Sequence, residues 1–265
     1  MTAGIHPLAD GADGARMAVG TLTVVPVRVE RVDRAVAGWA MALAPAVGLG
    51  IGVAAAGVLL LAGAVGLSPL LSAALAVGAL ALLTRGLHLD GLADLADGLG
   101  SARPADGALD IMKRSDIGPF GVITLVLVLL IQVLAVGRLA EAAPLTGVAG
   151  LLTAVAAGRL AITWACTPRV PAARPEGLGA FVAGTVPWWA AGLGTAVVPL
   201  LAFLGWAEGG WFVLGCALAV PVGLAVALGL LRHARRRLGG ITGDVLGALS
   251  ETATTAALLT AVAAL

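Results

Sequence analysis

The chain has 265 residues, of which 60% are hydrophobic and only 12% are charged, and its formal net charge is +1. A soluble domain has about 25% charged residues, so this composition excludes an ordinary soluble protein. A net charge so close to zero gives no support for a nucleic-acid partner. The sequence therefore predicts an integral membrane protein that has the lipid bilayer as its surroundings.

The first 34 residues precede the long apolar stretches. We expect residues 1–14 to be disordered and residues 15–34 to form an interfacial segment at the membrane surface. No linker, internal repeat or second soluble domain is visible in the rest of the chain. The sequence thus predicts a single integral membrane domain over residues 1–265.

Seven apolar stretches of about 20 residues follow, each long enough to cross a bilayer as a helix. The uncharged stretch from Ala35 to Thr84 is too long for one span, and it breaks at the turn signal Gly66-Leu67-Ser68-Pro69. We therefore expect an all-α, polytopic bundle of about seven transmembrane helices. The expected spans are 36–64, 69–88, 118–137, 145–165, 186–204, 211–231 and 244–264.

The basic residues indicate the orientation of this bundle. With a cytoplasmic N-terminus, fifteen of the sixteen Lys and Arg residues fall on the cytoplasmic side, and only Arg138 falls outside. Cytoplasmic loops are enriched in Lys and Arg. We therefore expect a multi-pass protein of the plasma or inner membrane, with its active site facing the cytoplasm and a cytoplasmic motif loop over residues 85–117.

Three carboxylates dominate the stretch that runs from His88 to Ser101. Asp90, Asp94 and Asp97 have the spacing i, i+4, i+7, which places them on one stripe of a helix, where like charges repel. Mg²⁺ prefers such oxygen ligands, together with substrate phosphates. The stripe predicts a Mg²⁺ site, and the alternative is a solvated acidic helix end paired with nearby arginines.

A second charged cluster lies just before the third span. We expect Asp116, at the turn into that span, to complete the metal site. For Asp106 the more ordinary interpretation is an interfacial helix with salt bridges between neighbouring turns. The cluster consists of Asp106, Asp110, Lys113, Arg114 and Asp116.

The third cluster leads into the last span through the run Gly239-Gly-Ile-Thr-Gly-Asp244. A helix N-terminus offers backbone N–H groups to a phosphate, so Thr242 and Gly243 are candidate phosphate-binding residues. Glu251 would lie within the hydrocarbon, where carboxylates are costly and usually functional. Arg159 in the fourth span carries the same cost, and we expect it to pair with a phosphate or with one of the acids.

Part of the acidic stripe also resembles the opening of the CDP-alcohol phosphotransferase motif. The resemblance covers Asp94-Leu-Ala-Asp97-Gly98 and the pair Ala102-Arg103, but one extra residue precedes that pair. A CDP-alcohol phosphatidyltransferase-like phospholipid enzyme is therefore one alternative. A cation-coupled secondary transporter, in which Asp90, Asp94 and Glu251 form a cation path, is another.

Three motifs of this chain resemble motifs of the adenosylcobinamide-GDP ribazoletransferases, or cobalamin synthases, and they follow one another in the same order as in that family. Weaker similarities are Leu22-Thr-x-x-Pro26 and Glu176-Gly-Leu-Gly179. The order of the motifs extends the resemblance over nearly the whole chain. The motifs are His88-x-Asp90-Gly-x-Ala-Asp94-x-x-Asp97-Gly, Ile111-Met-Lys-x-Ser115-x-Ile-Gly118-x-Phe-Gly121 and Leu238-Gly-Gly-x-Thr242-Gly-Asp244-x-Leu-Gly247-Ala.

The resemblance implies that a hydroxyl of α-ribazole, or of its 5′-phosphate, attacks adenosylcobinamide-GDP and expels GMP, with Mg²⁺ as cofactor. The metal would be held by the acidic stripe, and Thr242, Gly243 and Asp244 would shape the opposite wall. Candidates for the general base are His88, Asp94 and Asp244, and the sequence does not choose among them. Ser101, Arg103 and Lys113 are further candidates for substrate binding.

One departure from the family pattern affects the second motif. The family often has Lys-Asp-Ser-Arg where this chain has Lys113-Arg114-Ser115-Asp116, so acid and base have exchanged places. The sequence also leaves open the oligomeric state. The pair Gly48-x-x-x-Gly52 suits either a helix contact within one chain or the seam of a homo-oligomer.

Overall fold

The computed structural model describes residues 7–265, and all regular structure within them is helical. The helices are α1 (Pro7–Leu22), α2 (Arg34–Ala42), α3 (Ala44–Ala64), α4 (Pro69–Leu83), α5 (Leu87–Gly100), α6 (Ala105–Ile111), α7 (Pro119–Ala142), α8 (Pro144–Ala165), α9 (Gly177–Val182), α10 (Trp188–Val197), the 3₁₀ helix η1 (Val198–Glu208), α11 (Gly210–Leu238) and α12 (Gly243–Val262). The predicted all-α fold class is confirmed.

The long helices form one bundle of membrane-spanning length. Within residues 7–265, six helical segments are long and apolar enough to cross a bilayer, namely α3, α7, α8, α10 with η1, α11 and α12. The pair α4 and α5 passes the same criterion only when taken together, and it is bent by 87°. Counting that pair as one crossing gives the predicted number of seven.

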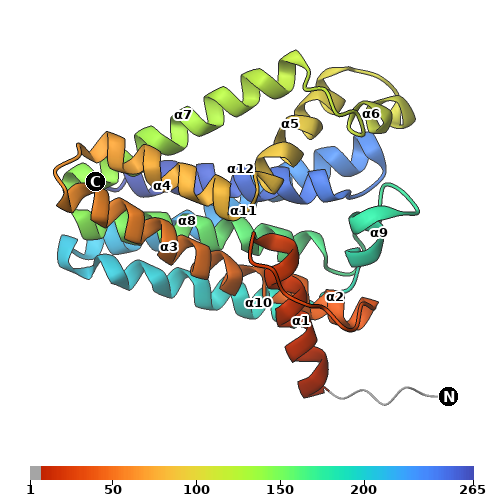
Figure 1. Ribbon diagram of the computed structural model, residues 1–265, viewed down its shortest axis with the longest axis horizontal. Helices are drawn as coiled ribbons and strands as arrows, with labels where there is room; N and C mark the ends of the chain where they lie inside the picture. The colour runs from red at the N-terminus through yellow and green to blue at the C-terminus, as the bar shows by residue number, and fades with distance from the viewer. Residues whose placement is uncertain (1–6) are drawn as a thin grey trace.

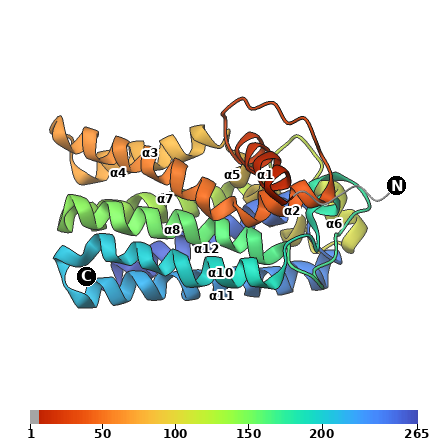
Figure 2. The same cartoon turned by 90° about the horizontal axis from the view of Figure 1, so that it is seen from below.

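Helix α1 and the C-terminus lie toward opposite ends of the bundle (Figures 1 and 2), as an odd number of crossings requires. One end carries the short helices α2, α6 and α9, and we call it the motif end (Figures 1 and 2). The C-terminus lies at the other end (Figures 1 and 2).

Two of the predicted spans are broken. The stretch 36–64 divides into α2 and α3, because Pro45 in the first turn of α3 has no N–H with which to continue the helix from α2. The stretch 69–88 ends early at Leu83. Arg85 and Gly86 then adopt left-handed φ values of 54° and 69°, which turns the chain into α5.

The N-terminal prediction is wrong for residues 7–14. These residues form the first half of α1, whereas residues 1–6 lie outside the described residues. Helix α1 packs against α2 so closely that a Cβ at Gly14 would lie 2.3 Å from Cβ of Trp39. This contact orders a segment that looks too polar to be structured when it is considered alone.

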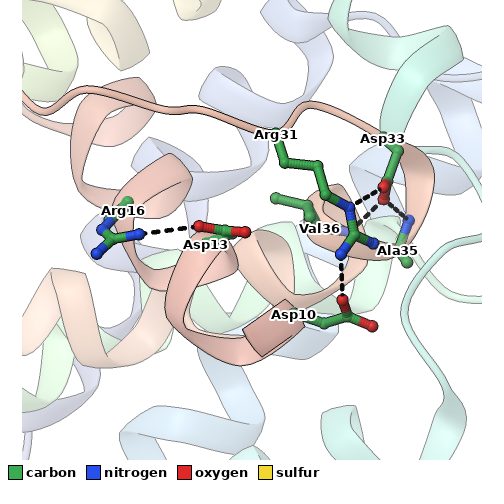
Figure 3. A network of polar contacts seen from close by, with 7 residues as sticks. All are labelled: Asp10, Asp13, Arg16, Arg31, Asp33, Ala35 and Val36. Atoms are coloured by element: carbon green, nitrogen blue, oxygen red, sulfur yellow. Dashed lines mark hydrogen bonds and ion pairs between the residues drawn. The ribbon is translucent and has the colours of Figure 1, made fainter. Parts of the chain in front are cut away.

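Arg31 fastens the connection between α1 and α2. Its guanidinium donates hydrogen bonds to Asp10 in α1 and to Asp33, the N-cap of α2 (Figure 3). Asp33 also accepts the N–H groups of Ala35 and Val36, each at 2.9 Å. The hydrogen bond from Arg31, with those from the backbone, lowers the pKa of Asp33 below its usual value.

Helix α8 forms the centre of the bundle, since 89% of its apolar window is buried against other helices. Helix α3 approaches it through two glycines. A Cβ at Gly48 would lie 2.6 Å from the Arg159 side chain, and one at Gly52 would lie 3.1 Å from Leu152. The predicted glycine pair therefore makes a helix contact within the chain.

Candidate active site

Helices α5 and α12 cross at the motif end through two reciprocal glycine contacts. A Cβ at Gly91 of α5 would lie 2.8 Å from both Cα and the carbonyl oxygen of Asp244. A Cβ at Gly247 of α12 would lie 3.0 Å from Cα of His88. The first and third sequence motifs, which are about 150 residues apart, thus meet backbone against backbone.

This contact brings the acidic stripe against the start of α12, as the sequence analysis predicted for the two walls of the site. We call the residues Asp90, Gly91 and Asp94 of α5, together with Asp244 of α12, the acidic crossing. Asp90 is exposed, whereas Asp94 and Asp244 are half-buried. No ion pair within 4.0 Å neutralises these three carboxylates in the described part of the chain.

Crowding at the acidic crossing is strongest for Asp94. The chain bends by 87° between α4 and α5, and α5 lies at the motif end, beyond this bend in the crossing (Figure 1). Burial, followed by the charges of Asp90, Asp244 and Asp97, raises the pKa of Asp94 to about 7. Carboxylates arranged in this way attract a cation, because a cation removes their mutual repulsion.

Asp97, the third member of the stripe, has a defined structural partner. Its carboxylate accepts the N–H groups of Gly118 at 2.7 Å and Gly121 at 2.9 Å, and so it caps the N-terminus of α7. A Cβ at either glycine would lie within 2.5 Å of this carboxylate. Asp97 therefore joins the first motif to the second, and its predicted role as a metal ligand stays a prediction.

Thr242 shapes the N-terminus of α12. Its hydroxyl accepts the N–H of Val245 at 3.2 Å and donates to Oδ2 of Asp244 at 3.1 Å. Just before it, Ile241 pairs with the loop that follows α8, since Ala173 N–H donates to the Ile241 carbonyl at 2.9 Å. Capping and pairing together fix the direction of the Asp244 side chain relative to α5.

The donor chemistry of the acidic crossing fits Mg²⁺, although the side chains alone do not enclose an ion. Across residues 7–265, no group of three Asp, Glu, His or Cys side chains is close enough to surround a metal. Protein Mg²⁺ sites commonly use only one or two carboxylates, with substrate phosphates and water as the other ligands. Asp94, with Asp90 or Asp244, provides this incomplete set of oxygen ligands.

Comparison with known proteins decides the family. A sequence profile described as cobalamin-5-phosphate synthase matches residues 14–262. An adenosylcobinamide-GDP ribazoletransferase of Frankia casuarinae is 48% identical over 259 residues, covering 92% of each chain. A protein of the same name from a Nocardioides species is 42% identical over 248 residues, covering 93% of this chain and 97% of its own length. The chain belongs to the cobalamin-5-phosphate synthase family.

Family membership confirms the resemblance found in the three motifs. A third relative of the same name, from Bradyrhizobium diazoefficiens, is 37% identical over 250 residues and covers 94% of this chain and 92% of its own length. No solved structure matches the chain. The names of these relatives support neither the phospholipid-enzyme alternative nor the transporter alternative.

The remaining polar candidates lie within the predicted motif loop over residues 85–117. The Ser101 hydroxyl donates to the Gly98 carbonyl at 2.7 Å and caps the end of α5. Arg103, Lys113 and Asp116 are exposed. No ion pair among the described residues links these three side chains to the acidic crossing, so their roles in binding stay predictions.

Arg159 and Glu251 meet inside the bundle, in what we call the inner polar group. The two side chains form an ion pair at 3.9 Å, and Gln132 Nε2 donates to Glu251 at 2.9 Å. Ser250 accepts a hydrogen bond from Arg159, and Thr255 accepts one from Gln132. The predicted pairing of Arg159 with one of the acids is thus present, in a setting enclosed by helices.

His88 faces the interior of the bundle. Its side chain is 2% exposed, and neither ring nitrogen has a hydrogen-bond partner in the described structure. A group that is to accept a proton from a substrate must lie within hydrogen-bond reach of that substrate. Asp94 and Asp244, which are only half-buried, fit the role of general base better than His88 does.

Sequence reasoning missed Arg174 and Gln132. Gln132 is an uncharged residue in the middle of an apolar span, and its position gave no signal beyond its polarity. Arg174 lies two residues before the weak Glu176-Gly-Leu-Gly179 similarity, and it was counted only as a cytoplasmic basic residue. That similarity pointed to this part of the chain, but it did not show which residues lie near Arg174 in the fold.

Proposed function

We propose that the chain is an adenosylcobinamide-GDP ribazoletransferase that depends on Mg²⁺. In the proposed reaction, a hydroxyl of α-ribazole or of its 5′-phosphate attacks the cobinamide-linked phosphorus of adenosylcobinamide-GDP. The new P–O bond joins the two substrates, the P–O bond to GMP breaks, and the hydroxyl proton passes to a base. The meeting of Asp90 and Asp94 with Asp244 at the glycine contact is the observation that carries this proposal.

The acidic crossing would hold Mg²⁺ through Asp94 and Asp90, which leaves Asp244 to act as the base. When bound, the ion would supply positive charge against the diphosphate of the substrate, which lowers the cost of negative charge on the leaving GMP. Asp97 supports this arrangement indirectly, because it ties the N-terminus of α7 to the stripe-bearing helix.

The protein itself would mainly position the two substrates. The N-terminus of α12, at Thr242 and Gly243, points backbone N–H groups and the positive end of a long helix dipole toward the same region. We assign the proton to Oδ1 of Asp244, because the Thr242 hydroxyl engages Oδ2 and orients the carboxylate. Orientation of this kind lowers the entropic cost of bringing two large substrates together.

We further propose that the motif end faces the cytoplasm and that the protein lies in the plasma membrane. The loops that carry nearly all Lys and Arg residues adjoin this end (Figure 1). Single cysteines at exposed Asp106 and at exposed Glu141 would test this orientation, since the native Cys166 and Cys216 are buried. In right-side-out vesicles an impermeant maleimide should label E141C only, and labelling of D106C would reverse the orientation.

The direct test of the reaction is release of GMP by the purified protein. With adenosylcobinamide-GDP, α-ribazole and Mg²⁺, we expect one GMP for each cobamide formed, and no GMP when the ribazole is omitted. Running the assay with α-ribazole 5′-phosphate in place of the nucleoside compares the two acceptors. Folded protein that releases no GMP with either acceptor would rule out the proposed activity.

A further inference from the structure

Arg174 is held beside the acidic crossing by the backbone of its loop. Ala173 N–H donates to the Ile241 carbonyl, and Ile241 N–H donates to the Pro171 carbonyl, both at 2.9 Å. Gly240 lies so close that a Cβ there would come within 2.3 Å of the Pro171 carbonyl oxygen. The loop that carries Arg174 is thus fixed directly against the residues that precede Thr242.

The guanidinium of Arg174 is only partly engaged. Nη2 donates to the carbonyl of Leu109 in α6, whereas Nε is buried and has no hydrogen-bond partner in the described structure. A buried N–H without a partner costs free energy, so its presence in a folded protein calls for an explanation. A ligand atom that accepts from Nε would remove this cost.

Arg174 is a charged residue of the loop that pairs with Ile241, three residues before Asp244. Yet no carboxylate oxygen lies within 4.0 Å of its guanidinium among the described residues. The hydrogen bond to Leu109 engages only Nη2, so the positive charge of Arg174 stays available to an anion.

An anion that also binds a metal ion suits both kinds of group, the carboxylates of the acidic crossing and the guanidinium of Arg174. A phosphate can share oxygens with a cation at the carboxylates and accept paired N–H groups from the planar guanidinium. Arginine is suited to this geometry because its donors form a rigid fork.

From this arrangement we infer that Arg174 binds the phosphate of the nucleotide that leaves, opposite the carboxylates that would hold the metal. The inference rests on the proposed function and adds a residue to it. Arg174 would stabilise the negative charge that develops on the departing GMP, and it would retain GMP as a product.

Binding of GMP to the purified protein, measured by calorimetry in detergent with Mg²⁺, tests this assignment without any turnover. We expect R174Q to bind GMP about 10- to 100-fold more weakly, the usual loss for a charge-assisted pair. R174K, which keeps the charge but not the fork, should recover part of the affinity. R235Q is the matched control, because Arg235 donates to the Arg169 carbonyl of the same loop but is exposed.

A purely structural role gives a different pattern. If Arg174 only anchors the loop to Leu109, then R174Q and R235Q should alter thermal stability while GMP affinity stays at the parent value, and the inference is wrong. Should R174Q fail to fold, R174K with intermediate affinity supports the inference, and R174K with parent affinity overturns it. A parent that binds no GMP also overturns the inference, whereas a parent that binds GMP through Arg174 but releases none from adenosylcobinamide-GDP contradicts the proposed function alone.

Discussion

The acidic crossing and the inner polar group place charge in this apolar chain in opposite ways. In the inner polar group, the ion pair of Arg159 and Glu251 is enclosed, and both residues have further hydrogen-bond partners. At the acidic crossing, carboxylates on two helices face one another with no ion-pair partner within reach in the described structure, and they remain partly open to solvent. Paired charge inside the bundle supports its architecture, whereas unpaired charge at its end is suited to binding a cation and a phosphate.

The largest expected effect comes from Asp94→Asn. This change removes one negative charge from the acidic crossing but keeps the size of the side chain. We expect GMP release to fall by about 10²- to 10³-fold or more, because a group that stabilises developing charge is lost. Thermal stability should stay the same or rise, since the variant no longer buries a charge or repels the neighbouring carboxylates, the two effects that raise the pKa of Asp94. An active D94N protein would remove Asp94 from the proposed metal site.

The glycine contact offers a purely steric way to disturb the same region. In Gly91→Ala the new Cβ would lie 2.8 Å from the Asp244 backbone, so α5 and α12 must move apart. We expect kcat/KM to fall about 10- to 100-fold, because small misplacements of catalytic groups are costly. Gly78→Ala in α4 is the matched control, since nothing lies within 4 Å of its new Cβ. Equal activity of the two variants would show that the contact is not needed.

The inner polar group should respond in stability rather than in activity. Glu251→Leu leaves the Arg159 charge buried without its partner, which typically costs about 3–5 kcal/mol. The double variant Arg159→Met/Glu251→Leu should regain much of this loss, because no charge is then left unpaired. GMP release per folded molecule should stay within a few-fold of the parent. A raised KM with unchanged stability would instead support the predicted role of Glu251 in substrate binding.

The smallest effect concerns the connection at Arg31 (Figure 3). The pKa of Asp33 is lowered in the folded protein, so its ionised form contributes stability at pH values above its unfolded pKa near 3.8. That contribution is lost as the pH falls through the lower, folded pKa. Asp33→Ala should therefore destabilise α2 at neutral pH by about 0.5–2 kcal/mol, as for other N-caps. Melting curves at pH 7 and pH 3 should differ less for D33A than for the parent.

The sequence predicted the fold class and the number of crossings because both follow from apolar length and basic loops. It did not predict the break at Pro45 or the turn at Arg85 and Gly86. Backbone conformation, which hydropathy does not report, determines where these two spans break. The helix over residues 7–14 was missed for a similar reason. Contact with α2 stabilises it, and a tertiary contact leaves little trace in local composition.

The candidate site, like the fold, was predicted only in part. Helical spacing placed the carboxylates on one stripe, and the order of the motifs suggested that Asp244 lies opposite. Spacing did not reveal that Asp97 caps α7, because its partners are backbone N–H groups 21 and 24 residues away. Nor did it reveal that the loop carrying Arg174 pairs with Ile241, just before Thr242.

Metal binding tests the contrast between the two regions most directly. Mn²⁺, used as a spectroscopic substitute for Mg²⁺, can be titrated by electron paramagnetic resonance into the purified parent, D94N and E251Q proteins, each with GMP present. The account predicts one bound Mn²⁺ in the parent and in E251Q, and binding weakened by tenfold or more in D94N. Equal binding by the parent and D94N, or loss of binding only in E251Q, would contradict it.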